Sequence, residues 1–273
     1  AMAFEPREKD FLGDFKMLSK RFPRELARAA LETAILRLEA ERKFPAEMAS
    51  KMYFTREALE QATSWEVASY RAQRYAGYEQ VYDLGCSLGA ATLAMRHGMN
   101  VPGCRLIGID NSAAMIERCA HHIALDDHPT PVDLVCADIL HHPLDDASVI
   151  TLNFTLQFIA PDQRQPLLQR LRESLRPGGA LILSEKIHFE DPLEQALLEA
   201  LHLDFKRANG YSELEISQKR AALEQVLIPE TLQAHRERLL AAGFAQVSLW
   251  YQSFNFVSLV AVAPGTREQE RTA

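Results

Sequence analysis

The sequence predicts an α/β fold with a seven-stranded, mostly parallel sheet that ends in an antiparallel hairpin and follows a helical N-terminal extension. Short apolar runs alternate with stretches of helical periodicity, which is typical of strand–helix units. A glycine-containing turn joins the first run to a helix, and polar residues follow several of the runs. Polar groups at strand ends indicate a ligand site at the carboxyl edge of a parallel sheet.

The most informative stretch is the nine-residue run from Val81 to Gly89, VYDLGCSLG. An apolar strand passes through two glycines, four residues apart, into a helix that we expect at 90–97. Glycine lets the backbone approach a ligand with no Cβ in the way, and the N–H groups at the start of a helix face such a ligand. We therefore expect Gly85, Cys86 and Ser87 to contact a bound cofactor.

A second apolar strand, expected at 105–110, ends in Asp110 and is followed by Asn111. Asp110 follows Gly85 at about the spacing at which nucleotide-binding α/β folds place a carboxylate on the ribose hydroxyls. The turn and this carboxylate together predict an adenosine site. The alternative is a structural turn followed by an ordinary aspartate at a strand end.

The shape of the turn separates two classes of adenosine cofactor. A dinucleotide site requires G-x-G-x-x-G, in which the second glycine makes room for a pyrophosphate, whereas this chain has GCSLG. Asp83 precedes the turn, where a carboxylate repels phosphates and attracts a cation. S-adenosylmethionine carries a sulfonium and an ammonium group and no phosphate. The charge pattern therefore favours S-adenosylmethionine over NAD.

Two further strands end in polar residues at the same expected edge. A strand at 132–136 leads to Asp138 and Ile139, which we expect at the adenine, and a strand at 148–153 ends in Asn153. Ligands in open α/β sheets bind outside the carboxyl ends of the strands. Four such motifs in order predict the Rossmann-like fold of class I S-adenosylmethionine-dependent methyltransferases.

The rest of the chain supplies the other elements of this fold. The patterns predict, in order, helices at 112–124 and 163–175, a strand at 180–185, a helical insert at 191–225, a helix at 230–241 and two final strands at 245–251 and 255–262. We therefore divide the chain into a helical extension or lid at 1–78, a catalytic domain at 79–264 and a disordered tail at 265–273.

Longer stretches of the catalytic domain carry a more specific pattern. They are YDLGCSLGAATL from Tyr82, IDNS from Ile109, LNFTLQF from Leu152 and DFKRANGYSELEISQKR from Asp204. The last stretch is long and polar and is not a generic methyltransferase element. Over residues 81–262 the chain resembles the carboxy-S-adenosyl-L-methionine synthases, which act in the modification of the transfer-RNA wobble uridine.

The resemblance implies a reaction, its substrates and one catalytic residue. Members of that family convert S-adenosylmethionine and prephenate to carboxy-S-adenosylmethionine and phenylpyruvate, and they form homodimers. The product carries a new carboxylate, which the planar fork of an arginine binds well. The resemblance assigns this role to Arg220, at the end of the polar stretch; a solvated helix arginine is the alternative. No side chain is identified as the general base.

The first eighty residues do not follow the synthase pattern. The stretch from Phe54 to Trp65 resembles instead the helical N-terminus of THUMP-like methyltransferases, so the chain is either a divergent member or a composite of two relatives. Helical periodicity predicts that residues 4–78 form helices over the cofactor edge of the sheet. The tyrosine that the synthases place near the cofactor in this segment has no identified counterpart here.

Composition narrows the classes of function. Residues 1–80 carry 14 basic and 13 acidic side chains, and the remaining residues carry 16 and 24. An acidic catalytic part weighs against direct nucleic-acid binding, which needs a basic face, and favours a small-molecule substrate. No stretch has the ~20 apolar residues of a membrane span, so we expect a cytoplasmic protein. The cysteines and histidines lack metal-ligand spacing, so no metal is expected.

Three functions remain open at this point: a carboxy-S-adenosylmethionine synthase, a methyltransferase acting on a small molecule or RNA, and a chain that binds S-adenosylmethionine with little catalysis. Arg220 separates the first from the second, because methyl transfer has no need of a cation beside the methyl group.

Overall fold

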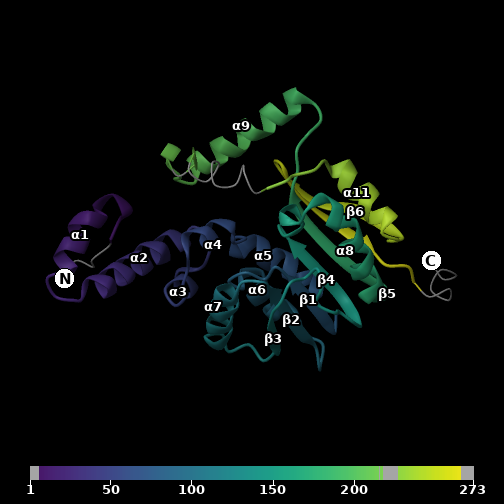
Figure 1. Ribbon diagram of the computed structural model, residues 1–273, viewed down its shortest axis with the longest axis horizontal. Coiled ribbons are helices and arrows are strands. Elements are labelled where there is room, and N and C mark those ends of the chain that lie inside the picture. The colour runs from purple at the N-terminus through teal and green to yellow at the C-terminus, as the bar shows by residue number, and fades with distance from the viewer. Residues whose placement is uncertain (1–5, 215, 218–226, 266–273) are drawn as a thin grey trace.

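The computed structural model of the 273-residue chain describes residues 6–214, 216–217 and 227–265. Among these residues, a seven-stranded sheet has the strand order β3-β2-β1-β4-β5-β7-β6 (Figure 1). The strands are β1 (Gln80–Leu84), β2 (Arg105–Asp110), β3 (Val132–Cys136), β4 (Ala147–Asn153), β5 (Leu175–Lys186), β6 (Gln246–Ser253) and β7 (Phe256–Val262). Neighbouring strands from β3 to β5 are parallel, and β7 runs antiparallel to β5 and β6. The predicted mostly parallel sheet with its terminal hairpin is confirmed.

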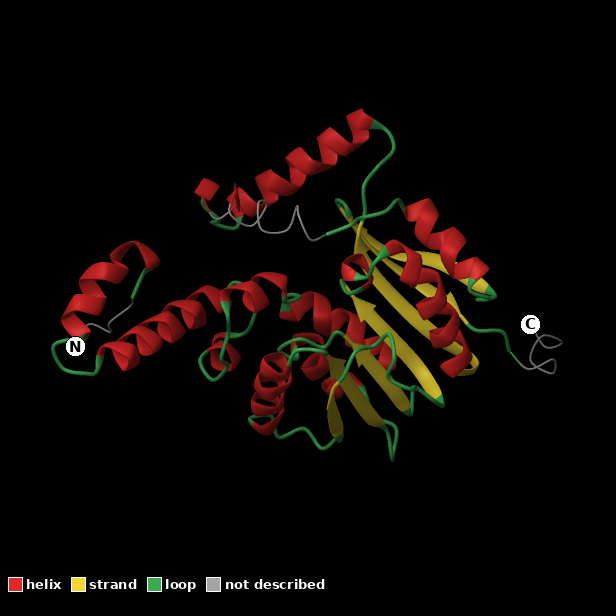
Figure 2. Ribbon diagram, viewed as in Figure 1, coloured by secondary structure: helices red, strands yellow, loops and turns green. Residues whose placement is uncertain are grey.

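Helices cover both faces of the sheet and continue into the N-terminal extension (Figure 2). They are α1 (Phe11–Leu18), α2 (Arg24–Ala40), α3 (Ala46–Ala49), α4 (Arg56–Gln61), α5 (Trp65–Ala72), α6 (Ala90–Gly98), α7 (Ala113–Ala124), α8 (Pro161–Ser174), α9 (Pro192–Ala208) and α11 (Leu232–Ala241), with 3-10 turns η1 (Glu8–Asp10), η2 (Gln73–Tyr75) and η3 (Leu156–Phe158). No helix in the described part of the chain is both long and apolar enough to cross a bilayer.

Side chains of the strands alternate between two apolar cores, one on each face of the sheet. Tyr82 and Leu84 of β1 belong to the core that includes Leu168 of α8. Val81, which precedes Tyr82, belongs instead to the core that includes Met95 of α6. Because both faces are covered, the parallel strands read in the sequence as nearly continuous apolar runs.

The N-terminal extension consists of two parts, which we call the arm and the base. The arm, α1 and α2, reaches away from the sheet, and the base, α3 to α5, lies against the domain (Figure 1). Phe44, before α3, and Phe54, before α4, share one apolar core with Leu88 of the β1–α6 turn and Leu93 of α6. The base is therefore packed directly against the turn at which the sequence predicts a cofactor.

The insert between β5 and α11 begins with α9, within the range where the sequence predicts a helical insert. Its distal part approaches the N-terminal arm, because the guanidinium carbon of Arg42, just after α2, lies 5.4 Å from the ring centroid of Tyr211. Residues 215 and 218–225 of the predicted insert, residue 226 after it, and residues 266–273 of the predicted tail lie outside the described residues.

A buried histidine joins the base to the turn. The Nδ1 atom of His122, on α7, lies 2.8 Å from the carbonyl oxygen of Leu88, and its Nε2 atom accepts a hydrogen bond of 2.9 Å from the Tyr53 N–H. A carbonyl only accepts, so Nδ1 carries the proton and the ring is neutral. Burial lowers the pKa of His122 below its ordinary value. The neutral ring therefore connects three segments that are distant in the sequence.

The two hydrogen bonds of the buried, neutral His122 predict that the protein loses stability in acid. The pKa of His122 is lower in the folded chain than in the unfolded chain, so its contribution is fully present above about pH 6.5 and is lost as the pH falls through the lower, folded-state pKa. His122→Leu should lower the free energy of unfolding by about 1–3 kcal/mol at neutral pH and flatten its decline in acid. Denaturant titrations at several pH values measure the free energy of unfolding and its decline in acid. The control is His121→Leu, which replaces the exposed neighbouring histidine. An unchanged slope in His122→Leu would contradict the assignment.

Candidate functional site

The turn between β1 and α6 has a backbone shape that glycine permits. Gly85 and Gly89 have φ angles of +77° and +89°, in the left-handed region. A Cβ atom at Gly85 would lie 2.4 Å from Oγ1 of Thr155, and one at Gly89 would lie 2.5 Å from Sγ of Cys119. The turn is therefore enclosed by the segment after β4 on one side and by α7 on the other, and neither glycine tolerates a side chain.

Asp110, the last residue of β2, joins this turn to the start of α7. Its Oδ2 atom accepts a hydrogen bond of 2.9 Å from the Ser87 N–H, and its Oδ1 atom accepts one of 2.9 Å from the Ser112 N–H. Each carboxylate oxygen has a second lone pair, which leaves acceptor capacity for two ribose hydroxyls. Asn111, the next residue, is exposed at the same edge.

The segment after β3 continues this edge. Asp138 is exposed, and its Oδ1 atom accepts a hydrogen bond of 2.9 Å from the Leu140 N–H, whereas Ile139 is buried. The Ala137 N–H donates to the carbonyl oxygen of Asp110 at 3.0 Å, which keeps the exit of β3 beside that of β2. Asp138 and Ile139 thus lie one strand beyond the carboxylate of Asp110, on the side toward which the adenine would extend if Asp110 held the ribose.

Asn153 ends β4 on the other side of the turn. Its Oδ1 atom accepts a hydrogen bond of 3.1 Å from Nη1 of Arg71. Asp83 accepts hydrogen bonds from the hydroxyls of Thr92, at 2.6 Å, and Thr151, at 2.9 Å, and burial raises its pKa. Only 1% of Asp83 is exposed, so it supports the turn from the interior rather than contacting a ligand.

The structure brings the predicted cofactor residues to one continuous edge, since β3, β2, β1 and β4 are neighbours in the sheet. These residues are Gly85, Cys86 and Ser87 after β1, Asp110 and Asn111 at β2, Asp138 and Ile139 after β3, and Asn153 at β4. Cys86 is 5% exposed, so its backbone and not its thiol faces this edge. Arg220, the predicted catalytic residue, lies outside the described residues.

Arg71 of α5 was not singled out from the sequence, although a signal for it was present. It lies on the same helical stripe as Ala68, Ala72 and Tyr75, which are all buried apolar positions. An arginine inside an apolar stripe is unusual, because a charged side chain is rarely buried without a partner. Arg71 is 7% exposed and reaches Asn153 at the predicted site.

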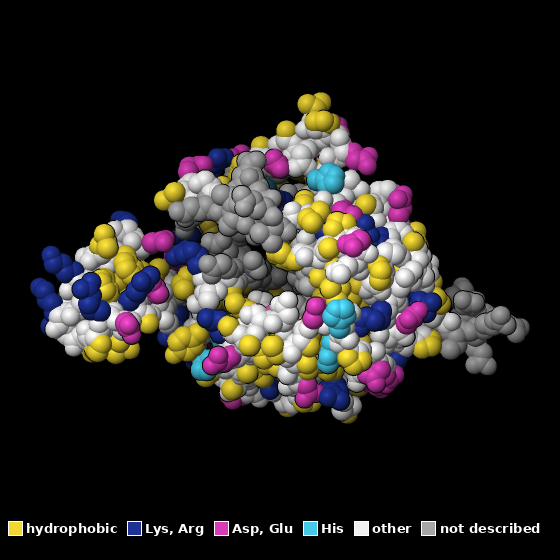
Figure 3. Space-filling view, viewed as in Figure 1, with side chains coloured by type: hydrophobic (Ala, Val, Ile, Leu, Met, Phe, Trp, Pro, Cys, Tyr) yellow, Lys and Arg dark blue, Asp and Glu magenta, His cyan; other side chains and the backbone are white. Residues whose placement is uncertain are grey.

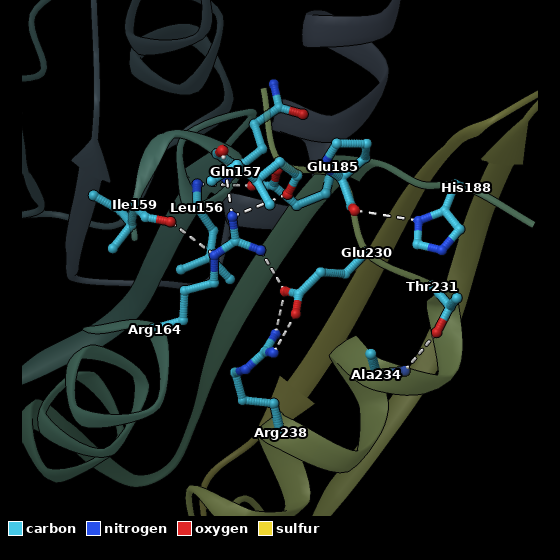
Figure 4. Close-up of polar contacts among 12 residues, drawn as sticks. Leu156, Gln157, Ile159, Arg164, Glu185, His188, Glu230, Thr231, Ala234 and Arg238 are labelled. Atoms are coloured by element: carbon cyan, nitrogen blue, oxygen red, sulfur yellow. Dashed lines mark hydrogen bonds and ion pairs between the residues drawn. The ribbon is translucent and has the colours of Figure 1, made fainter. Parts of the chain in front are cut away.

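An ion-pair cluster fixes the point where the insert returns to the domain (Figure 4). The carboxylate of Glu230, just before α11, accepts hydrogen bonds from the guanidinium groups of Arg164 and Arg238. Arg164 is fully buried and also donates to the carbonyl oxygens of Ile159 and Ile228, each at 2.9 Å. The segment that follows the predicted position of the catalytic arginine is thereby attached to α8.

A second buried carboxylate ties the end of β5 to the segment beside the glycine turn. Both oxygens of Glu185, near the end of β5, accept backbone hydrogen bonds, from Leu156 at 2.9 Å and Gln157 at 3.1 Å. Burial raises the pKa of Glu185 to about 8, against the opposing effect of these N–H donors. The η3 segment that Glu185 holds follows Thr155, whose side chain fills the space beside Gly85. The ends of β1, β4 and β5 are therefore mechanically connected.

Replacing Asp110 tests the adenosine site. Asp110→Ala should weaken binding of S-adenosylmethionine by about 1.5–3 kcal/mol, the scale for hydrogen bonds to a charged group, which is roughly 10-fold to 150-fold. Isothermal calorimetry measures the affinity. Asp133→Ala, in β3 but exposed and paired with Arg105, is the matched control and should bind normally. An unchanged affinity in Asp110→Ala would remove this residue from the site.

Replacing Glu230 tests the attachment of the insert. Glu230→Gln leaves two guanidinium groups opposite a neutral amide, one of them fully buried, so the free energy of unfolding should fall by about 2–4 kcal/mol. Glu237→Gln lies on the exposed face of the adjoining helix α11, where the carboxylate accepts a hydrogen bond from Gln233, and should change the free energy of unfolding by less than about 0.5 kcal/mol. Equal effects of the two substitutions would show that the cluster adds no stability.

Comparisons with known proteins place this geometry in a family. A family model described as a methyltransferase domain matches residues 81–179. Among solved structures, human N-acetylserotonin methyltransferase in complex with SAM has a TM-score of 0.53 over 93% of this chain and 66% of its own, at 18% identity. A protein from Bordetella parapertussis has a TM-score of 0.56, at 18% identity, over 94% of this chain and 87% of its own. These likenesses show the class I methyltransferase fold.

Curated relatives are much more similar. The carboxy-S-adenosyl-L-methionine synthase of Marinobacter nauticus is 66% identical over 181 residues, which are 66% of this chain and 72% of that protein. The synthase of Geobacter metallireducens is 61% identical over 66% of this chain and 75% of its own length. The synthase of Pseudomonas aeruginosa is 58% identical over 67% of this chain and 76% of its own length. Because this identity extends over about three quarters of each relative, the chain belongs to the carboxy-S-adenosyl-L-methionine synthase family.

Proposed function

We propose that this chain converts S-adenosylmethionine and prephenate to carboxy-S-adenosylmethionine and phenylpyruvate, for the modification of the transfer-RNA wobble uridine. The observation that carries the proposal is its 58–66% identity to synthases of that name. The edge formed by β3, β2, β1 and β4 supports it, because polar groups suited to an adenosine gather there. The turn at this edge reads GCSLG and not the G-x-G-x-x-G of a pyrophosphate site.

The predicted residues bind different parts of the nucleoside. The carboxylate of Asp110 accepts hydrogen bonds from the ribose hydroxyls, while Asp138 and Ile139 bind the adenine. Backbone groups of the turn around Ser87 lie under the ribose and the sulfonium, where glycine neighbours permit close approach. Asn153, at the end of β4, contacts the amino-acid part of the nucleoside.

The reaction requires a methyl carbon that acts as a nucleophile. Prephenate loses carbon dioxide and expels hydroxide as its ring becomes aromatic, which yields phenylpyruvate. The hydroxide takes a proton from the sulfonium methyl group and becomes water, and the resulting ylide carbon attacks the carbon dioxide. The enzyme supplies orientation and exclusion of water for these steps. No side chain of this chain has to serve as the base.

The new carboxylate needs a fixed cation, and we assign this role to Arg220. The assignment rests on the resemblance of the polar stretch that starts at Asp204. Glu230 and its two arginine partners hold the chain only ten residues further on. A planar guanidinium fork binds both oxygens of a carboxylate at once, which a lysine does not.

We further propose a cytoplasmic homodimer that does not bind nucleic acid directly. The dimer is supported by exposed apolar residues on α9 that recur every four residues, namely Leu193, Leu197, Leu201 and Phe205, which are 80%, 59%, 44% and 54% exposed. The arm likewise exposes apolar side chains among dark blue Lys and Arg side chains (Figure 3). A second copy of the chain would cover such a stripe.

A turnover assay tests the reaction. With S-adenosylmethionine and prephenate, the chain should release phenylpyruvate and form the carboxylated nucleoside, measured by ultraviolet absorbance and mass spectrometry. Arg220→Leu should keep its affinity for S-adenosylmethionine and lose about 30-fold or more in affinity for the carboxylated form, since truncating one partner of a partly buried charge pair costs about 2–5 kcal/mol. Arg220→Lys should recover part of this loss.

The matched control is Arg207→Leu, an exposed arginine of the same polar stretch that pairs with Asp204 and Glu213. It should bind both nucleosides normally. Equal loss of both nucleosides in Arg220→Leu would make that residue structural. If the parent chain forms no phenylpyruvate and shows no preference for the carboxylated nucleoside, that result would favour a methyltransferase function over the synthase function.

A further inference from the structure

Arg71 is a buried cation without an acidic partner in the described part of the chain. It is 7% exposed, and no ion pair joins its guanidinium to an Asp or Glu side chain of the described residues. Nη1 donates to Oδ1 of Asn153 at 3.1 Å, whereas Nε, also buried, has no hydrogen-bond partner among these residues. Burying a guanidinium costs several kcal/mol unless a counter-charge compensates it. The partner that Arg71 lacks among the described residues is an anion.

The guanidinium lines a small cleft between α5, α6 and the end of β4. Thr63, Tyr75 and Asn153 are its other polar lining residues, and Ala68 and Met95 are among its apolar ones. Because Asn153 ends β4, the cleft lies at the carboxyl end of that strand, the same edge of the sheet as the glycine turn. Arg71 therefore belongs to the site, although it comes from the N-terminal extension.

The order of the strands indicates which part of the nucleoside reaches this cleft. The adenine is assigned to the exit of β3 and the ribose to Asp110 at β2, so the rest of the molecule extends past β1 toward β4. Neighbouring strands lie about 4.8 Å apart, so the exits of β3 and β4 are separated by roughly 14 Å. An extended S-adenosylmethionine is long enough to cover this span, which brings its amino-acid end to Asn153 and Arg71.

We propose that Arg71 binds the α-carboxylate of the methionine moiety of the nucleoside. Nε and a neighbouring Nη atom form a planar fork that donates two hydrogen bonds to one carboxylate. The ligand supplies the counter-charge that the described residues do not provide. The inference rests on S-adenosylmethionine as the ligand and is independent of carboxyl transfer. It also gives the N-terminal base a role in binding: α5 completes a site whose other known parts lie after residue 80.

Two nucleosides that differ only in this carboxylate test the proposal. We would measure the affinities of S-adenosylmethionine and of decarboxylated S-adenosylmethionine by calorimetry for the full-length parent, Arg71→Gln and Arg71→Lys. Arg71→Gln should lose about 30-fold or more for S-adenosylmethionine and less than about threefold for the decarboxylated compound. Arg71→Lys should recover part of the loss, because it keeps the charge without the fork.

The matched control is Arg74→Gln, one turn further along, where the guanidinium stacks on Tyr70 and Trp250, outside the cleft. It should bind both compounds as the parent does. Equal loss of both compounds in Arg71→Gln, or in Arg71→Lys if the first variant does not fold, would show that Arg71 acts only on the structure. A third titration, with carboxy-S-adenosylmethionine, completes the test. A larger loss in Arg71→Gln for this ligand than for S-adenosylmethionine would assign Arg71 to the transferred carboxylate and overturn the proposal.

These outcomes are separable from those of the proposed reaction. A parent chain that binds S-adenosylmethionine tightly and yields no phenylpyruvate would refute the synthase function. Even then, a loss of affinity in Arg71→Gln for S-adenosylmethionine but not for the decarboxylated compound would still support the inference. A parent chain that binds S-adenosylmethionine and decarboxylated S-adenosylmethionine with equal affinity would contradict the inference, whether or not it produces phenylpyruvate.

Discussion

The site depends on the carboxylate of Asp110. Its two oxygens hold the N–H groups of Ser87 and Ser112, and through them the turn after β1 and the start of α7. Without this carboxylate, two helix-leading turns would present unpaired N–H groups at the edge of a parallel sheet, and their relative position would no longer be fixed. The same group is the one that a ribose would contact, so structure and binding are coupled in a single side chain.

The N-terminal base is part of this arrangement rather than an appendage. Its aromatic side chains Phe44 and Phe54 share a core with Leu88 of the turn, and His122 bonds both sides of the joint. Displacing the base would uncover apolar surface on α6 and remove Arg71 from the cleft. The part of the chain that departs most from the synthase pattern thus contacts the part that follows it most closely.

Much of the fold could be predicted from the sequence, because parallel strands covered on both faces leave continuous apolar runs. The strand expected at 105–110 is found at Arg105–Asp110, and the one expected at 148–153 is found at Ala147–Asn153. The shared position of the residues that we expect at the cofactor was predictable as well, since each ends or follows such a strand. Long-range pairing was not predictable: Arg164 and Glu230 lie 66 residues apart, and Arg71 reaches Asn153 only because α5 packs on α6. The interior role of Asp83 depends on hydroxyls of two other elements and was likewise hidden.

The mass of the nucleoside that co-purifies with the native chain tests the central claim most directly. The account predicts that the edge of the sheet retains an adenosyl nucleoside, and that denaturation releases S-adenosylmethionine or, from cells that supply prephenate, its carboxylated form. Release of S-adenosylhomocysteine alone would indicate methyl transfer. A chain that copurifies with no adenosyl nucleoside, and takes up none when S-adenosylmethionine is added, would contradict the account.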